Sequence, residues 1–121
     1  MISLQRNITI TVEGQVLRAT LNNSKAAHDF AELLPLTLTL EDYAGIEKVS
    51  DLPKRLSTAG VPSGSESSAG DITFYAPWGN LAIFYEDFRY SKGLIILGKI
   101  EGNIEVLKTA GSIKAQIELV E

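Results

Sequence analysis

Residues 70–99, GDITFYAPWGNLAIFYEDFRYSKGLIILGK, constrain the fold of this chain more than any other stretch, and they contain its only tryptophan. Residues 72–75 are β-branched and aromatic, residues 77–80 supply turn formers, and residues 81–85 are apolar again, which is the pattern of a β-hairpin. Residues 94–100 add a third strand, whose unbroken apolar first half indicates burial on both faces. We therefore expect this stretch to lie at the centre of a closed or nearly closed β-sheet.

Both ends of the chain have the alternation of half-buried strands. Residues 7–12 alternate strictly, residues 13–15 turn the chain, and residues 16–21 repeat the alternation more loosely, so a hairpin is predicted here. Residues 36–40 (LTLTL) and 113–120 alternate in the same way. Because the first and last strands each carry an apolar face that needs a partner, we expect both to belong to the same barrel.

Two short helices are predicted between the strands. The first follows residues 22–24 (Asn-Asn-Ser), whose side-chain oxygens can accept hydrogen bonds from the free N–H groups of a helix start. Its apolar residues recur at spacings of three and four, with Phe30 as the expected anchor at one end of the barrel, and Pro35 ends it. The second helix is expected at residues 104–109, after a turn that contains Gly102.

Two segments lack strand periodicity. Residues 41–60 contain charges, glycine and a proline, and we interpret them as a connection with a helical turn at residues 52–56. Residues 60–70, GVPSGSESSAG, are mostly Gly, Ser and Pro, a composition that buries too little apolar surface to order itself. We expect them to form an exposed, flexible loop.

These elements predict a mainly β fold. A chain of 121 residues is long enough to bury one core and too short for two, so residues 1–121 are expected to form a single domain. About seven strands and two short helices fit a closed or nearly closed β-barrel whose helices cap its ends.

Composition excludes several classes of function. A net charge of −4 with scattered basic residues argues against nucleic-acid binding, which needs clustered Lys and Arg. The absence of cysteine removes thiolate nucleophiles and thiolate metal sites, and a single histidine puts the common zinc sets out of reach, so no metal or cofactor is expected. No stretch has membrane-spanning length and no signal-peptide pattern opens the chain, so a cytoplasmic location without a membrane partner is expected.

Several runs of the sequence resemble a known family. GDITFYAPWGNLAIFY, followed closely by GLIILGKI, is similar to the most characteristic run of small bacterial domains with a cyclophilin-like fold. NSKAAHDFAELL, with its Asp29-Phe30 pair, resembles the helix after the opening hairpin of cyclophilins, and LGKIEGNIEVLK resembles their closing strand and last helix. The resemblance covers nearly the whole chain and implies a cyclophilin-like barrel. It implies no reaction, because this branch of the fold has no settled activity.

The residues that true cyclophilins use for prolyl isomerisation are not matched. Their Arg, in a Phe-His-Arg run, donates a hydrogen bond near the proline nitrogen and so weakens the partial double bond of the peptide. This chain has no such run; the matching region, residues 43–55, offers Lys54 and Arg55, and the sole histidine, His28, lies in the first predicted helix. We therefore expect no efficient prolyl isomerase activity.

Trp78 is the main candidate binding residue. A Pro-Trp-Gly-Asn turn would hold the indole near the surface, where it can stack on a ligand, whereas the alternative is that Trp78 folds back and caps the barrel. Tyr75 and Asn80 flank this turn, and the outward-facing aromatic residues of the same stretch would add an aromatic patch. Arg55 could pair with an anionic group or remain a solvated surface residue.

Two functions are consistent with these residues. The first is a binding module, whose groove holds a peptide or small molecule and is formed by Trp78, Tyr75, Asn80, Arg55 and the loop at residues 60–70. The alternative is an enzyme, either a weak peptidyl-prolyl isomerase that relies on Arg55 or an enzyme acting on small molecules. Fold resemblance alone cannot decide between them.

Overall fold

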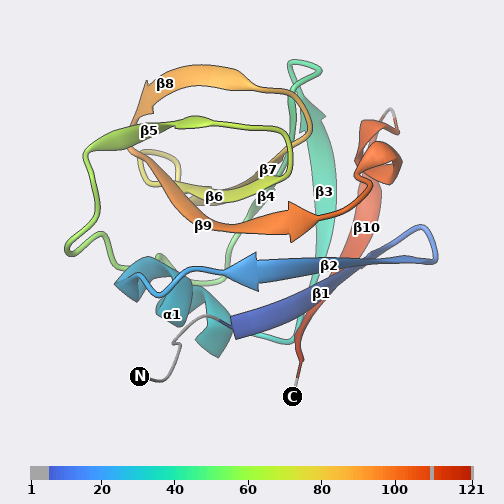
Figure 1. The fold of residues 1–121 in the computed structure, drawn as a ribbon, viewed down its shortest axis with the longest axis horizontal. Helices are drawn as coiled ribbons and strands as arrows, with labels where there is room; N and C mark the ends of the chain where they lie inside the picture. The colour runs from blue at the N-terminus through green and yellow to red at the C-terminus, as the bar shows by residue number, and fades with distance from the viewer. Residues whose placement is uncertain (1–5, 110, 121) are drawn as a thin grey trace.

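The computed structural model describes residues 6–109 and 111–120. Figure 1 shows a barrel of antiparallel strands with a second, small sheet lying against it. The elements in chain order are β1 (Arg6–Val12), β2 (Gln15–Leu21), α1 (Lys25–Glu32), β3 (Leu36–Tyr43), β4 (Glu47–Asp51), β5 (Gly64–Ser67), β6 (Asp71–Tyr75), β7 (Asn80–Phe84), β8 (Phe88–Lys92), β9 (Leu94–Glu101), the 3₁₀ helix η1 (Glu105–Lys108) and β10 (Ile113–Leu119). The mainly β, closed barrel expected from the sequence is confirmed, although the described ranges contain more strands than the seven expected.

Eight strands close the barrel in the order β1-β10-β3-β4-β7-β6-β9-β2, with β2 returning to β1. β10 pairs with β1 on one side and with β3 on the other, so the first and last strands belong to the same barrel, as expected, and the structure shows that they are neighbours. Ile10 and Ile117 lie directly opposite each other in this pairing, and both are fully buried. The period-two alternation of the sequence therefore sets which side chains fill the barrel.

The structure corrects the interpretation of residues 41–60. β3 continues to Tyr43, and Glu47–Asp51 forms β4, which pairs with β3 and β7. No helical turn is present at residues 52–56, and Leu56 packs into the core. The strand was missed because its inward-facing residue is Lys48, a charged side chain where the pattern calls for an apolar one.

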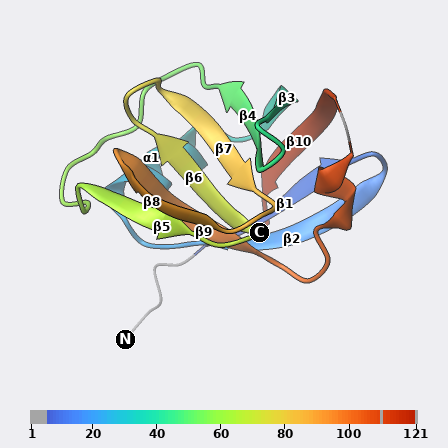
Figure 2. The same ribbon diagram turned by 90° about the horizontal axis from the view of Figure 1, so that it is seen from above.

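The loop expected at residues 60–70 also contains a strand. β5 pairs with β8 in a two-stranded sheet outside the barrel (Figures 1 and 2). Gly64 is buried, and a Cβ at this position would lie 2.4 Å from the backbone oxygen of Ser91 and 2.7 Å from Tyr90 Oη. Order in this segment comes from backbone pairing and close approach of the two strands, which composition does not reveal.

The two helical elements lie on opposite sides of the molecule (Figures 1 and 2). Ser24 caps α1 by accepting a hydrogen bond from the Ala27 amide at 3.1 Å, and Phe30 is fully buried, as expected for the anchor. The second expected helix is only a four-residue 3₁₀ turn, η1, which buries Leu107. Within the described ranges, no helix is long and apolar enough to cross a membrane.

Candidate ligand-binding site

An apolar pocket of about 230 Å³ lies on the outer face of the barrel, against β4, β7 and β6. β8 covers one side of it, and the turn between β6 and β7 borders it. The lining residues are Tyr43, Glu47, Val49, Tyr75, Trp78, Asn80, Phe84, Phe88, Ser91 and Leu94. The fold thus brings together three of the residues expected at the site, Tyr75, Trp78 and Asn80.

The strand register gives the pocket two different ends. Glu47 lies opposite Phe84 of β7 and opposite Tyr43 of β3. Four residues further along β4, Asp51 lies opposite Asn80. At a rise of about 3.3 Å per residue, the backbone positions of Glu47 and Asn80 are roughly 13 Å apart along the strand direction. The pocket is therefore elongated along β4 and β7.

Aromatic rings enclose the pocket from several directions. The Trp78 indole stands nearly perpendicular to the ring of Tyr43, at a centroid distance of 5.8 Å, and to that of Tyr75, at 5.4 Å. Phe84 and Phe88 stack on each other at 6.2 Å. Trp78 is 60% exposed, so its indole does not fold back to cap the barrel. Its exposed face is available to a ligand.

Arg55 lies behind the Trp78 turn and outside the pocket lining. Its guanidinium donates a hydrogen bond to the Ala76 carbonyl at 2.5 Å and stands 5.9 Å from the centroid of the Phe74 ring. Gly79, in the same turn, has a φ of 70°, and a Cβ there would lie 2.8 Å from Arg55 Nη1. Arg55 therefore supports the backbone that presents Trp78, and the positive φ of Gly79 favours glycine in this turn.

Two polar side chains of the pocket lack partners. The Asn80 amide oxygen has no hydrogen-bond partner among residues 6–109 and 111–120, although the residue is only 8% exposed. Among the described residues, no cation forms an ion pair with the Glu47 carboxyl, and burial raises the pKa of Glu47 to about 7. Because polar groups that are removed from water without partners are unfavourable, the buried Asn80 and the half-buried Glu47 are both suited to meet polar groups of a ligand.

Sequence reasoning missed Tyr43, Glu47 and Ser91 as pocket residues. Tyr43 and Glu47 lie in strand segments that had been interpreted as a connection, and Ser91 lies in β8, which covers the pocket. The expected contribution of residues 60–70 is absent from the lining, where β8 takes their place. In the part of the chain that the structure describes, no group of three or more potential metal ligands was found.

Comparison with known proteins identifies the family of this chain. The model of the cyclophilin-like family matches residues 10–118. The chain belongs to the cyclophilin-like family. Among solved structures, the hypothetical protein AF2241 from Archaeoglobus fulgidus is similar, with a TM-score of 0.68, 14% sequence identity and 98% of each chain covered. At this identity the likeness shows the fold alone. None of the curated proteins matches the chain.

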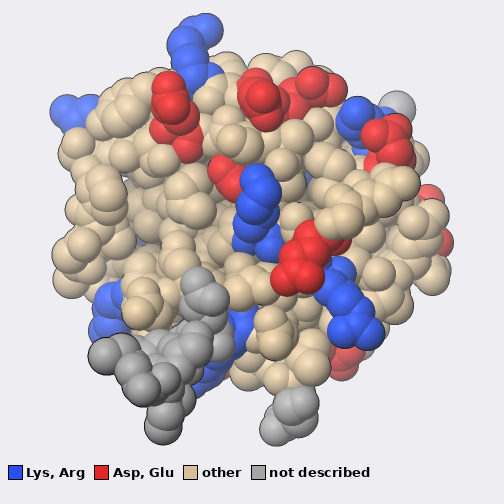
Figure 3. All heavy atoms as spheres, viewed as in Figure 1, with Lys and Arg blue, Asp and Glu red and all other residues tan. Residues whose placement is uncertain are grey.

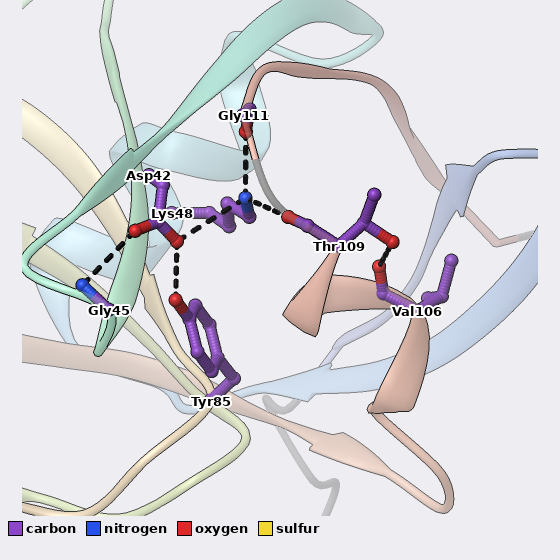
Figure 4. A network of polar contacts seen from close by, with 7 residues as sticks. All are labelled: Asp42, Gly45, Lys48, Tyr85, Val106, Thr109 and Gly111. Atoms are coloured by element: carbon purple, nitrogen blue, oxygen red, sulfur yellow. Dashed lines mark hydrogen bonds and ion pairs between the residues drawn. The ribbon is translucent and has the colours of Figure 1, made fainter.

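The cyclophilin-like barrel also holds a buried lysine close to η1 (Figure 4). The Lys48 ammonium donates hydrogen bonds to the carbonyl oxygens of Thr109 and, at 2.8 Å, of Gly111, and lies 3.4 Å from Asp42 Oδ1. These three acceptors match the three donors of an ammonium group. Lys48 therefore ties the segment after η1 to β4 and has a structural role.

Asp42 links this lysine to Tyr85 (Figure 4). The Tyr85 hydroxyl donates a hydrogen bond to Asp42, which also accepts one from the Gly45 amide at 3.1 Å. The hydrogen bond from Tyr85 is the main cause of the lowered pKa of Asp42. The pKa of Tyr85 is raised to about 12, mainly by burial and secondly by its hydrogen bond to Asp42. At neutral pH the cluster in this cyclophilin-like chain thus contains an ionised Asp42 and a neutral Tyr85.

Proposed function

We propose that this protein is a binding module that holds a small molecule or a peptide in the outer pocket and lacks efficient prolyl isomerase activity. The observation that carries the proposal is a pocket with aromatic walls into which a buried Asn80 presents an unpartnered amide oxygen. Ligand sites combine apolar walls with a few polar groups that orient the ligand. A cavity of about 230 Å³ is smaller than most drug-sized sites, so it suits a group of side-chain size.

Surface charge supports an organic or peptide ligand over a nucleic acid. The chain carries a net charge of −4, and on the face in Figure 3 acidic and basic side chains are interspersed. Binding to a phosphate backbone favours a clustered basic surface. In contrast, binding an apolar group of a ligand in the apolar pocket is favourable, because the group is removed from water.

Replacing Trp78 with alanine should abolish ligand binding while the fold survives. The probes are 1-hexanol and a short proline-containing peptide, and binding is followed through the amide resonances of β4 and β7 by NMR. Because Trp78 is 60% exposed, its truncation removes mainly its contacts with Tyr43 and Tyr75, worth about 1 kcal/mol each. A buried tryptophan would instead cost about 3–5 kcal/mol of stability in a thermal melt.

Tyr90→Ala is the matched control for this experiment. Tyr90 is a 53% exposed aromatic residue outside the pocket lining, so its truncation should leave probe binding unchanged. If neither probe shifts the resonances of β4 and β7 in the wild type, or if Trp78→Ala binds as the wild type does, the pocket is not the ligand site.

A protease-coupled assay on a proline peptide should give no rate above the uncatalysed background. Arg55 donates its hydrogen bond to Ala76 behind the Trp78 turn, which directs the guanidinium away from a peptide in the pocket. A kcat/KM of about 10⁴ M⁻¹s⁻¹ or more, the range of ordinary enzymes, would contradict this expectation. Arg55→Ala would then show whether that residue carries the activity.

An enzyme acting on small molecules is the second candidate, and one observation favours it. Glu47 lines an apolar pocket with a pKa of about 7, which suits a general acid or base near neutral pH. Such a group contributes about 10²–10⁴-fold to a rate. Under this alternative, Glu47→Gln lowers the turnover of a bound substrate by that factor.

A further inference from the structure

We propose that the Glu47 end of the pocket is a subsite for an organic ammonium ion, whose apolar stem extends along the pocket toward Asn80. This inference rests on the proposed function and names the chemistry of the ligand. The ammonium group belongs either to a free small amine or to the lysine side chain of a peptide. Both sources present the same cation on the same kind of thin, flexible stem.

The immediate surroundings of Glu47 favour a cation. In the strand register its neighbours are Tyr43 on β3 and Phe84 on β7, and Phe88 stacks on Phe84 from β8. Aromatic faces attract cations through their quadrupole, and the attraction is greatest where water is excluded. A carboxylate placed among aromatic rings therefore combines two features that recognise an organic cation, whereas an anionic ligand would be repelled.

No protein cation already fills this subsite within the described ranges. Lys48, the next residue of β4, faces the barrel interior, where its ammonium has three oxygen neighbours. From β8, the Arg89 guanidinium lies 5.2 Å from the centroid of the Phe88 ring and forms no ion pair with a described residue. Glu86, which follows β7, lies near this end of β4, since its backbone amide donates a hydrogen bond to the Ile46 carbonyl at 3.3 Å. Its side chain is acidic and supplies no cation.

The pKa of Glu47 is that of a half-buried carboxyl without an ion-pair partner among the described residues. Burial raises its pKa to about 7, since the ionised form is desolvated without a compensating charge. A ligand cation beside the carboxylate supplies that charge and stabilises the ionised form. The other ionisable side chains in the lining are the phenols of Tyr43 and Tyr75, so Glu47 contributes the only carboxyl group of the lining.

The far end of the pocket sets the shape of the ligand. The Asn80 amide oxygen is buried, unpartnered and part of the lining, so it can accept a hydrogen bond from an N–H or O–H group of the ligand. Its backbone position lies roughly 13 Å from that of Glu47 along the strands. Between them the lining residue of β4 is Val49, whose apolar side chain suits an alkyl stem. The site therefore fits an elongated molecule with its cation at one end.

The test compares three probes that share a six-carbon stem and differ in the head group: n-hexylammonium, 1-hexanol and hexanoate. Binding is measured by calorimetry and by the fluorescence of Trp78, the only tryptophan. At pH 8 we expect n-hexylammonium to bind at least tenfold more tightly than 1-hexanol, and hexanoate to bind most weakly. In Glu47→Gln the affinity for n-hexylammonium should fall to that for 1-hexanol, whose own affinity should not change and so shows that the pocket is intact.

The pH dependence provides a second readout. With a pKa of about 7, Glu47 is roughly one-tenth ionised at pH 6 and nine-tenths ionised at pH 8, so affinity for n-hexylammonium should rise about tenfold over this interval. The probe itself stays protonated, as a lysine side chain does. Glu47→Gln should remove the dependence. Glu118→Gln is the matched control, because Glu118 is exposed on β10, and it should keep the wild-type profile.

The outcomes separate the two proposals. Equal affinities for n-hexylammonium and 1-hexanol in the wild type would overturn the cation subsite and leave the binding module standing. Binding by none of the three probes would overturn both. A further pair of acetylated tripeptides, with central lysine or norleucine, identifies the source: preference for the lysine peptide over n-hexylammonium assigns the subsite to a peptide, and the reverse assigns it to a free amine.

Discussion

Removal of residues 113–121 should leave a chain that does not fold cooperatively. β10 pairs with β1 on one side and with β3 on the other, and its inward residues Ile113, Ala115 and Ile117 are at most 3% exposed. Each buried isoleucine contributes about 1.5–3 kcal/mol, and the open barrel also loses two ladders of backbone hydrogen bonds. The total is comparable to the whole stability of such a domain, about 5–15 kcal/mol. Circular dichroism melting and amide NMR dispersion measure the effect.

Point variants within β10 measure how much its buried side chains contribute to stability, apart from the loss of the whole strand. Ile117→Ala should lower the free energy of unfolding by about 2–5 kcal/mol, because the side chain is fully buried opposite Ile10. Gln116→Ala, exposed on the same strand, should change it by less than about 0.5 kcal/mol. A truncated chain that still melts cooperatively near the wild-type temperature would show that closure by β10 is dispensable.

Replacement of Lys48 with methionine should lower the free energy of unfolding by about 1–3 kcal/mol, because the carbonyl acceptors lose their donor while the partly exposed Asp42 can be hydrated. Methionine fills similar space but donates no hydrogen bond, so the carbonyl oxygens of Thr109 and Gly111 lose their ammonium partner and Asp42 loses its cation. For a domain of this size the melting temperature should fall by on the order of 10 °C. Urea unfolding and calorimetry provide the two measurements.

Lys114→Met is the control for the loss of a lysine. Lys114 is exposed on β10, and its replacement should change stability by less than about 0.5 kcal/mol. If Lys48→Met unfolds at the wild-type urea concentration, desolvation of the buried ammonium offsets its hydrogen bonds, and the cluster in Figure 4 gives no net stability.

Most of the barrel could be predicted from the sequence because its strands are half-buried. Residues 7–12, 72–75 and 113–120 alternate or cluster apolar residues in a way that only a strand buries efficiently. The structure confirms strands at each of these places and confirms that the first and last belong to one barrel, while their direct pairing became known only from the structure. Likewise, the Asn-Asn-Ser run and the spacing around Phe30 were sufficient for α1, because capping and helical periodicity are local.

The pocket depended on elements whose signals are not local. β4 could not be predicted because a charged residue, Lys48, faces inward from it. The ammonium group of Lys48 is bound by carbonyl oxygens that lie more than sixty residues away in the chain. β5 was concealed by a composition of Gly and Ser, since its order comes from pairing with β8. With β4 unpredicted, Glu47 could not be placed opposite Phe84, and with β5 taken as a loop, the covering role of β8 was not visible.

The class of fold, the strands with apolar alternation and the Trp78 turn between two strands could all be predicted from local residue preferences, because each depends on a few neighbouring positions. The contacts of Trp78 with Tyr43 and Tyr75, and the support of the turn by Arg55 from outside the pocket, became known only from the arrangement of the strands. The tertiary arrangement also placed a half-buried carboxyl, that of Glu47, at one end of the aromatic pocket. The physical reason is that exposure, charge pairing and cavity shape depend on which distant strands become neighbours, and no local pattern encodes that choice.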